Sequence, residues 1–62
     1  MNVQLTAKEL SSIEDQLYHE YTVIQKYRSY AENCTDQALA AKCTQFADKH
    51  QGHFNTLLSQ LQ

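Results

Sequence analysis

The sequence predicts an all-α fold, an antiparallel hairpin of two long helices in a single unit spanning residues 1–62. Three observations lead to this prediction. The chain has no proline and one glycine, and 42% of its residues are apolar, a profile that suits long uninterrupted helices. Apolar residues recur at steps of three and four along both halves, which is the period of a helix face. Turn-forming residues gather at one place, Asn33-Cys34-Thr35-Asp36.

The first helix is expected over about residues 6–33. Thr6 and Glu9 have the spacing of a capping box, in which each side chain bonds the backbone amide of the other. At 1.5 Å per residue, such a helix is ~40 Å long. Its inward positions are apolar apart from one carboxylate, and they are Leu10, Ile13, Leu17, Glu20, Ile24, Tyr27, Ala31 and Cys34.

The turn is expected at residues 33–36 and the second helix at about 37–61. Asn33 is expected to take the left-handed conformation that often ends a helix, and Thr35 or Asp36 to cap the helix that follows. Two helices of nearly equal length with a short connection fold antiparallel. The expected inward positions of the second helix are Leu39, Cys43, Phe46, His50, His53 and Leu57.

The apolar stripe is wider than a two-helix contact requires. Further apolar residues flank the inward positions of both helices, and they are Tyr21, Val23, Tyr30, Ala40, Ala47, Phe54 and Leu61. Because so wide a stripe needs more than one neighbouring helix, we expect a homodimer in which two hairpins form a four-helix bundle. The strict heptad spacing predicts left-handed supercoiling, with helices crossing at about +20°.

Ionisable residues interrupt both apolar stripes near mid-length. If the chain folds back at the turn, Glu20 lies level with His50, and His53 projects from the same helix face as His50. One carboxylate and two imidazoles are a plausible ligand set for a transition metal such as Zn, Ni, Cu, Mn or Fe. Two alternatives stay open: the three side chains form a buried hydrogen-bonded cluster that sets the register, or the histidines lie wet and idle at an edge. Tyr27 is the tyrosine nearest this layer.

The remaining features exclude several functions. Five scattered basic residues and a net charge of −2 argue against nucleic-acid binding. No apolar run approaches a membrane span, and residues 1–4 do not resemble a secretory signal, so we expect cytoplasmic synthesis without secretion.

Cys34 and Cys43 are expected ~10 Å apart along the helix and therefore free. The chain contains no phosphate-binding loop, nucleophile elbow or serine triad, which favours a protein that is not an enzyme.

The chain resembles a Coat F-type spore coat domain over nearly its whole length. The residues that carry the resemblance are Leu5-Thr6, Lys8-Glu9-Leu10, Glu14-Asp15-Gln16-Leu17, Tyr30-Ala31, Asp36, Leu39, Phe46-Ala47 and His53-Phe54-Asn55-Thr56-Leu57-Leu58. The resemblance implies a ferritin-like bundle in a spore-forming bacterium, a structural role in the spore coat or sporulation, and other spore coat proteins as partners.

Two positions depart from that family pattern. Gln37 stands where relatives tend to have proline after the turn aspartate. His50 stands where ferritin-like relatives carry the first residue of Glu-x-x-His, so that Glu20 and His53 alone match their metal ligands. The leading hypothesis is therefore a self-associating structural hairpin, and the alternative is a metal-binding or redox bundle that uses Glu20, His50 and His53.

Overall fold

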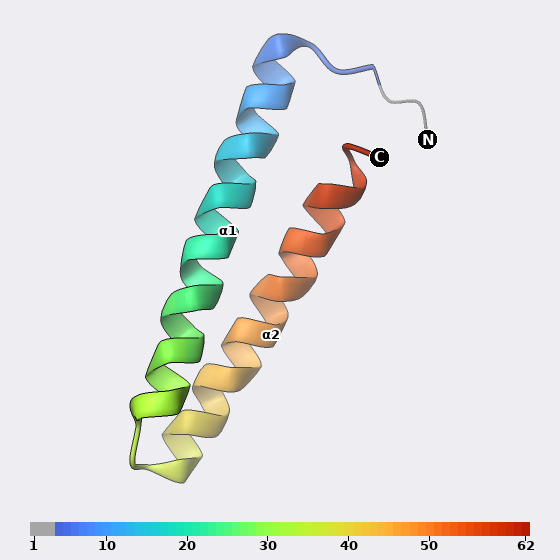
Figure 1. Cartoon of the computed structure of the whole chain (residues 1–62). Coiled ribbons are helices and arrows are strands. Elements are labelled where there is room, and N and C mark those ends of the chain that lie inside the picture. The colour runs from blue at the N-terminus through green and yellow to red at the C-terminus, as the bar shows by residue number, and fades with distance from the viewer. Residues whose placement is uncertain (1–3) are drawn as a thin grey trace.

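The computed structural model describes residues 4–62 and confirms the helical hairpin. Two helices, α1 (Ala7–Asn33) and α2 (Gln37–Ser59), run antiparallel and are joined by a short turn (Figure 1). The start of α1 and the end of α2 lie at the same end of the rod. The expectation that the chain carries no secretory signal rests partly on residues 1–3, which lie outside the described residues.

The start of α1 has the predicted capping box. The Glu9 backbone amide donates to the Thr6 hydroxyl oxygen at 3.0 Å, and the Thr6 amide donates to a Glu9 carboxylate oxygen at 3.0 Å. The hydroxyl satisfies an amide that the first helical turn leaves without a carbonyl, and the carboxylate holds the residue before the helix in place. Helix α1 therefore begins where its sequence indicated.

The turn differs from the expectation for Asn33. No residue among positions 4–62 has a positive φ angle, so the predicted left-handed conformation of Asn33 is wrong. Its side-chain amide instead donates to the Ser29 carbonyl at 2.8 Å, and the chain leaves α1 through an extended Cys34. Asp36 caps α2, because its carboxylate accepts from the amides of Ala38 at 3.0 Å and Leu39 at 3.2 Å. The carboxylate takes the place of the carbonyl groups that a preceding helical turn would supply, so these first amides of α2 are satisfied.

Helix α2 ends at Ser59, short of the expected residue 61. The Gln60 amide donates to the Leu57 carbonyl at 3.0 Å, and the Leu61 amide donates to the Leu58 carbonyl at 3.0 Å. Each of these bonds spans three residues rather than four, which is how a helix tightens as it closes. Leu61 therefore belongs to a terminal turn.

The face of α2 that packs against α1 is rotated from the predicted one. Ala47 is fully buried, whereas Leu39 and Phe46 are 54% and 46% exposed and His53 is exposed as well, so those three positions are not inward. Small residues at the contact let two helices approach closely, which favours the alanine edge of α2 over its leucine and phenylalanine edge. The positions that are buried or half-buried on this face are Ala40, Cys43, Ala47, His50, Gln51, Phe54 and Leu57.

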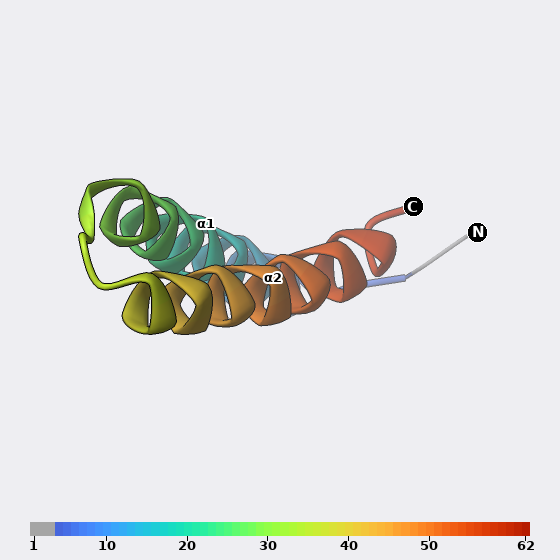
Figure 2. The same ribbon diagram turned by 90° about the horizontal axis from the view of Figure 1, so that it is seen from below.

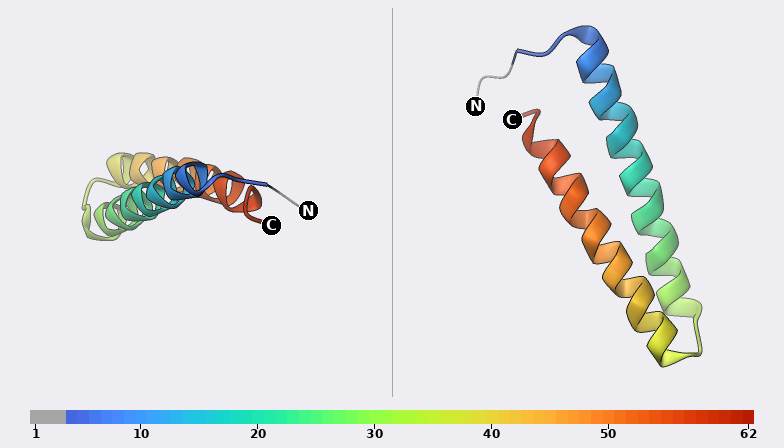
Figure 3. Two further views of the ribbon diagram at one scale, coloured as in Figure 1. Left: turned by 90° about the horizontal axis from the view of Figure 1, so that it is seen from above. Right: turned by 180° about the vertical axis from the view of Figure 1, so that it is seen from behind.

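The hairpin is a single layer of two helices. The Cα trace measures 46 × 18 × 10 Å, so the molecule is a narrow rod that is thinnest across its two broad faces. Views at right angles show α1 and α2 side by side with no second layer over the described residues (Figures 2 and 3). Both broad faces are therefore open. Within residues 4–62, neither helix is long and apolar enough to cross a membrane.

Candidate metal centre

Glu20 lies at the middle of α1, on the line where the two helices meet. The residue is 7% exposed and precedes the buried Ile24 by one helical turn. A carboxylate in such a place loses part of its hydration, so it needs hydrogen-bond donors from the protein. The helix that packs against it supplies them.

Two histidines of α2 turn the same ring nitrogen towards this carboxylate. His50 Nδ1 lies 2.9 Å from Glu20 Oε2 and 3.2 Å from Oε1, and His53 Nδ1 lies 3.5 Å from Oε1. An ionised carboxylate only accepts hydrogen bonds, so the proton of the His50 bond lies on Nδ1. That assignment leaves Nε2 of His50 as the free ring nitrogen when the imidazole is neutral.

The surroundings favour the ionised form of Glu20. The hydrogen bond from His50 lowers the pKa of this carboxyl group below its ordinary value, with a smaller contribution from His53, and partial burial opposes both. The side chains of His50 and His53 are 27% and 50% exposed, so solvent reaches the imidazoles but hardly reaches the carboxylate. The site is therefore an anionic oxygen group covered by two accessible nitrogen ligands.

Aromatic contacts hold the imidazoles in place. Tyr27 of α1 stacks on the His50 ring with centroids 6.2 Å apart and planes 13° from parallel. The His50 and His53 rings meet edge to face at 5.2 Å. Tyr27 also contacts Phe46 at 5.4 Å and Tyr30 at 6.2 Å. These five residues, Tyr30, Tyr27, Phe46, His50 and His53, form a continuous series of rings that we call the ring row.

The donor set fits a divalent transition ion. Ligand atoms of Glu20, His50 and His53 all lie within 4.8 Å of one another. Two ligands at 2.0–2.1 Å from a tetrahedral Zn²⁺ are about 3.3–3.4 Å apart, and the observed nitrogen–oxygen separations of 2.9 and 3.5 Å bracket that value. If the His50 proton moved from Nδ1 to Nε2, a small adjustment of the side chains would admit an ion between both Nδ1 atoms and the carboxylate. Two imidazoles and one carboxylate also leave at least one coordination position to be filled by another group.

The structure brings the three predicted site residues together and adds an aromatic neighbour. Glu20, His50 and His53 are brought together as expected, and His19 lies exposed on α1, outside the cluster. Tyr27, expected to be the tyrosine nearest this layer, stacks on His50, because it follows Glu20 by seven residues and therefore projects from the same helix face. The alternative in which both histidines lie at an edge without a partner does not hold for His50, because it forms a hydrogen bond with the Glu20 carboxylate.

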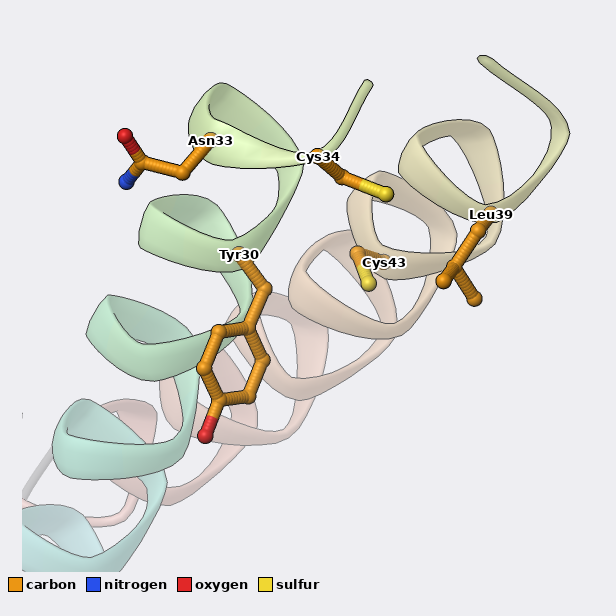
Figure 4. A pocket seen from close by; sticks show the side chains of 5 residues that line it. All are labelled: Tyr30, Asn33, Cys34, Leu39 and Cys43. Atoms are coloured by element: carbon orange, nitrogen blue, oxygen red, sulfur yellow. The ribbon is translucent and has the colours of Figure 1, made fainter. Parts of the chain in front are cut away.

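A pocket of about 310 Å³ lies near the turn (Figure 4). It is lined by Tyr30, Asn33, Cys34, Leu39 and Cys43. Both cysteines are free, as predicted, and the Cys34 thiol donates to the Asp36 carbonyl at 3.4 Å. The pocket continues the surface of the ring row towards the turn, because Tyr30 belongs to both.

Comparison of the chain with protein-family models, with curated proteins and with solved structures finds no match. The resemblance to Coat F-type proteins therefore stays a prediction. The geometry of the Glu20, His50 and His53 cluster and of the open ring row carries the functional argument.

Proposed function

We propose that this chain is an assembly module, in which two hairpins pack their open faces together into a four-helix bundle. The observation that carries the proposal is the exposure of large apolar side chains beside a very small core. Within residues 4–62, the buried apolar residues are Ile24, Cys43 and Ala47, whereas Leu39, Phe46 and Tyr30 are each about half exposed. Chains of this size draw added stability from a disulfide, a metal, exceptionally close helix packing or a partner chain, and the cysteines of this one are free.

The two faces of the layer are not equivalent. Tyr27 contacts Phe46 across the helices, while Arg28, which is about 100° further round α1, forms an ion pair with Asp48 at 3.2 Å. The ring row and the ion pair therefore flank the helix contact on opposite sides. The side with the ring row, together with Leu39 and the pocket by the turn, is the one we propose for packing against a second copy, and we call it the ring face.

Sedimentation equilibrium tests the assembly proposal. We expect the chain to be a dimer at micromolar concentration, and Leu39→Lys to shift it to monomer because a charge would be buried in the interface. Tyr18→Lys is the matched control, since Tyr18 is 73% exposed and lies outside the ring face. A folded monomer at these concentrations, or equal effects of the two substitutions, would contradict the proposal.

A second candidate function is binding of a divalent transition ion by Glu20, His50 and His53. The convergence of both Nδ1 atoms on one carboxylate favours it. We expect protein without a histidine tag to bind Zn²⁺ in calorimetry more tightly than it binds Mn²⁺, because imidazole ligands suit zinc. His53→Ala should weaken that binding and His19→Ala should not. The absence of heat and of any melting shift with Zn²⁺, Ni²⁺, Cu²⁺, Mn²⁺ and Fe²⁺ would end this proposal.

A role in the spore coat stays a proposal that rests on the sequence resemblance. We expect antibodies against the chain to detect it in coat extracts of spores from its source organism. Detection in growing cells alone would contradict that role, and it would leave the assembly and metal proposals unaffected.

A further inference from the structure

We propose that metal binding and self-association are coupled, because an ion held by Glu20, His50 and His53 completes its coordination with a group from a second copy of the chain. The partner is a second hairpin and the ion is of the zinc class. The proposal rests on both functions proposed above and adds a relation between them.

Glu20, the carboxylate of the cluster, lies at the middle of α1, and its partner His50 lies level with it on α2. Helix α1 runs from Ala7 to Asn33, so thirteen residues precede Glu20 within the helix and thirteen follow it. A two-fold axis through the middle of a dimer, whether along or across the helices, therefore brings a central layer close to its own copy. A residue at one end of the hairpin meets its own copy only if the axis runs along the helices, because an axis across the helices sends the copy to the opposite end.

The cluster also lies on the face that we propose to be covered. His50 and His53 are members of the ring row, and His53 is the more exposed of the two histidines. In a copy that holds no ion, the contacts with Glu20 use the Nδ1 atom of each imidazole, which leaves Nε2 of each ring as a ligand for an ion held by the other copy. Closing two ring faces would therefore put nitrogen ligands of one copy near the cluster of the other.

Coordination number points to the same partner. One hairpin offers three ligands, one from each residue of the cluster, whereas zinc is almost always bound by four groups in sites that hold structure together. In a monomer, water fills the fourth position. In the dimer, a ligand from the second cluster displaces that water, so that the ion joins the two chains.

Electrostatics predicts that the ion stabilises the dimer rather than the monomer. Two Glu20 carboxylates brought to the centre of a dimer repel each other and lose hydration. A divalent cation between them offsets both effects, and so the ion favours the dimer. Because such coupling is reciprocal, the dimer must bind the ion more tightly than the monomer does.

The test measures the dimer dissociation constant by sedimentation equilibrium with EDTA and with Zn²⁺. We expect Zn²⁺ to lower this constant by about 5–150-fold, the range that a typical coupling free energy produces. His53→Ala should abolish the effect of Zn²⁺ and His19→Ala should retain it. Circular dichroism of each variant verifies that the helices are intact.

A second measurement tests the reciprocal effect. The monomeric Leu39→Lys variant should bind Zn²⁺ more weakly than the parent chain, by about the same 5–150-fold, although Leu39 is no ligand. Tyr18→Lys should bind Zn²⁺ like the parent chain.

The three proposals fail in different ways. A chain that stays monomeric in EDTA and in Zn²⁺ overturns the assembly proposal, and a chain that binds no Zn²⁺ overturns the metal proposal; either result overturns the coupling as well. Equal dimer constants in EDTA and Zn²⁺, in a chain that dimerises and binds the ion, overturn the coupling alone.

Discussion

At the residue scale, the chemistry of this hairpin depends on the placement of one carboxylate. Glu20 is almost fully buried on the helix contact, where an unpaired charge would destabilise the fold. His50 meets that need with a hydrogen bond at 2.9 Å, and Tyr27 holds the His50 ring parallel to its own. Glu20 and Tyr27 belong to α1 and His50 belongs to α2, so the acid, its hydrogen-bond donor and the ring that orients the donor come from both helices. Glu20 and His50 therefore stabilise the helix contact and also belong to the proposed ligand set.

The lowered pKa of Glu20 predicts a loss of stability in acid. The pKa of Glu20 in the folded chain lies below its ordinary value of about 4.5, so the contribution of Glu20 to stability is fully present above about pH 4.5 and is lost as the pH falls through the folded-state pKa. Glu20→Gln should reduce the acid-side slope of melting temperature against pH. A slope remains, because the capping hydrogen bonds with Thr6 also lower the pKa of Glu9.

The same substitution should cost stability at neutral pH. Replacing the ionised acceptor by an amide weakens a charge-assisted hydrogen bond, which is worth about 1.5–3 kcal/mol. The exposed Glu14→Gln is the matched control on the same helix. Urea titrations of the three proteins at neutral and acid pH make the comparison, and an unchanged acid slope for Glu20→Gln would contradict the assigned role.

At the element scale, the two helices were predictable because local signals and periodicity agree. The Thr6 and Glu9 capping box, the Asp36 cap and the absence of proline all indicate the same two elements, and the structure has them. The rotation of α2 could not be read from the sequence. Two adjacent stripes of this helix are apolar at the same spacing, one starting at Leu39 and one at Ala40, and periodicity alone cannot decide which of them packs on α1.

The choice between those stripes makes Ala47 the tightest point of the helix contact. Ala47 is fully buried, so Ala47→Leu should force the helices apart and destabilise the chain by about 1–3 kcal/mol, the usual cost of overpacking. Ala41→Leu, at an exposed position of the same helix, adds the same atoms and should change the free energy of unfolding little. Urea unfolding of both variants measures the difference, and equal stabilities would place the contact elsewhere.

The interior of α2 also contains a position that favours the unfolded chain. No atom outside the adjoining backbone of α2 lies within 4 Å of the place where a Cβ of Gly52 would lie, and the φ angle of Gly52 is negative. Gly52→Ala should therefore stabilise α2 by about 1 kcal/mol, the difference in helix propensity between the two residues. Thermal melting followed by circular dichroism tests this, and a lower melting temperature would show that the position contacts a neighbour.

At the scale of the whole molecule, a layer one helix thick cannot exclude water from both of its faces. The cluster of Glu20, His50 and His53 was predictable because two regular helices joined by a tight turn bring fixed residues level with each other. The salt bridge between Arg28 and Asp48 was not, since it depends on the rotation of α2. That rotation also sends Phe46 to the surface, and so it places the aromatic residues around the cluster rather than beneath it.

Thermal unfolding should therefore depend on protein concentration. If two chains fold together, the melting temperature rises with concentration, because the equilibrium joins two unfolded chains into one folded dimer. With an unfolding enthalpy of roughly 0.7 kcal/mol per residue for both chains, a tenfold increase in concentration should raise the melting temperature by about 5 °C. Circular dichroism over a hundredfold range of concentration measures this, and Leu39→Lys should melt at a lower temperature with a weaker dependence. A melting temperature independent of concentration would mean that the ring face needs no second copy, because one exposed hairpin would then be stable with its aromatic residues in water.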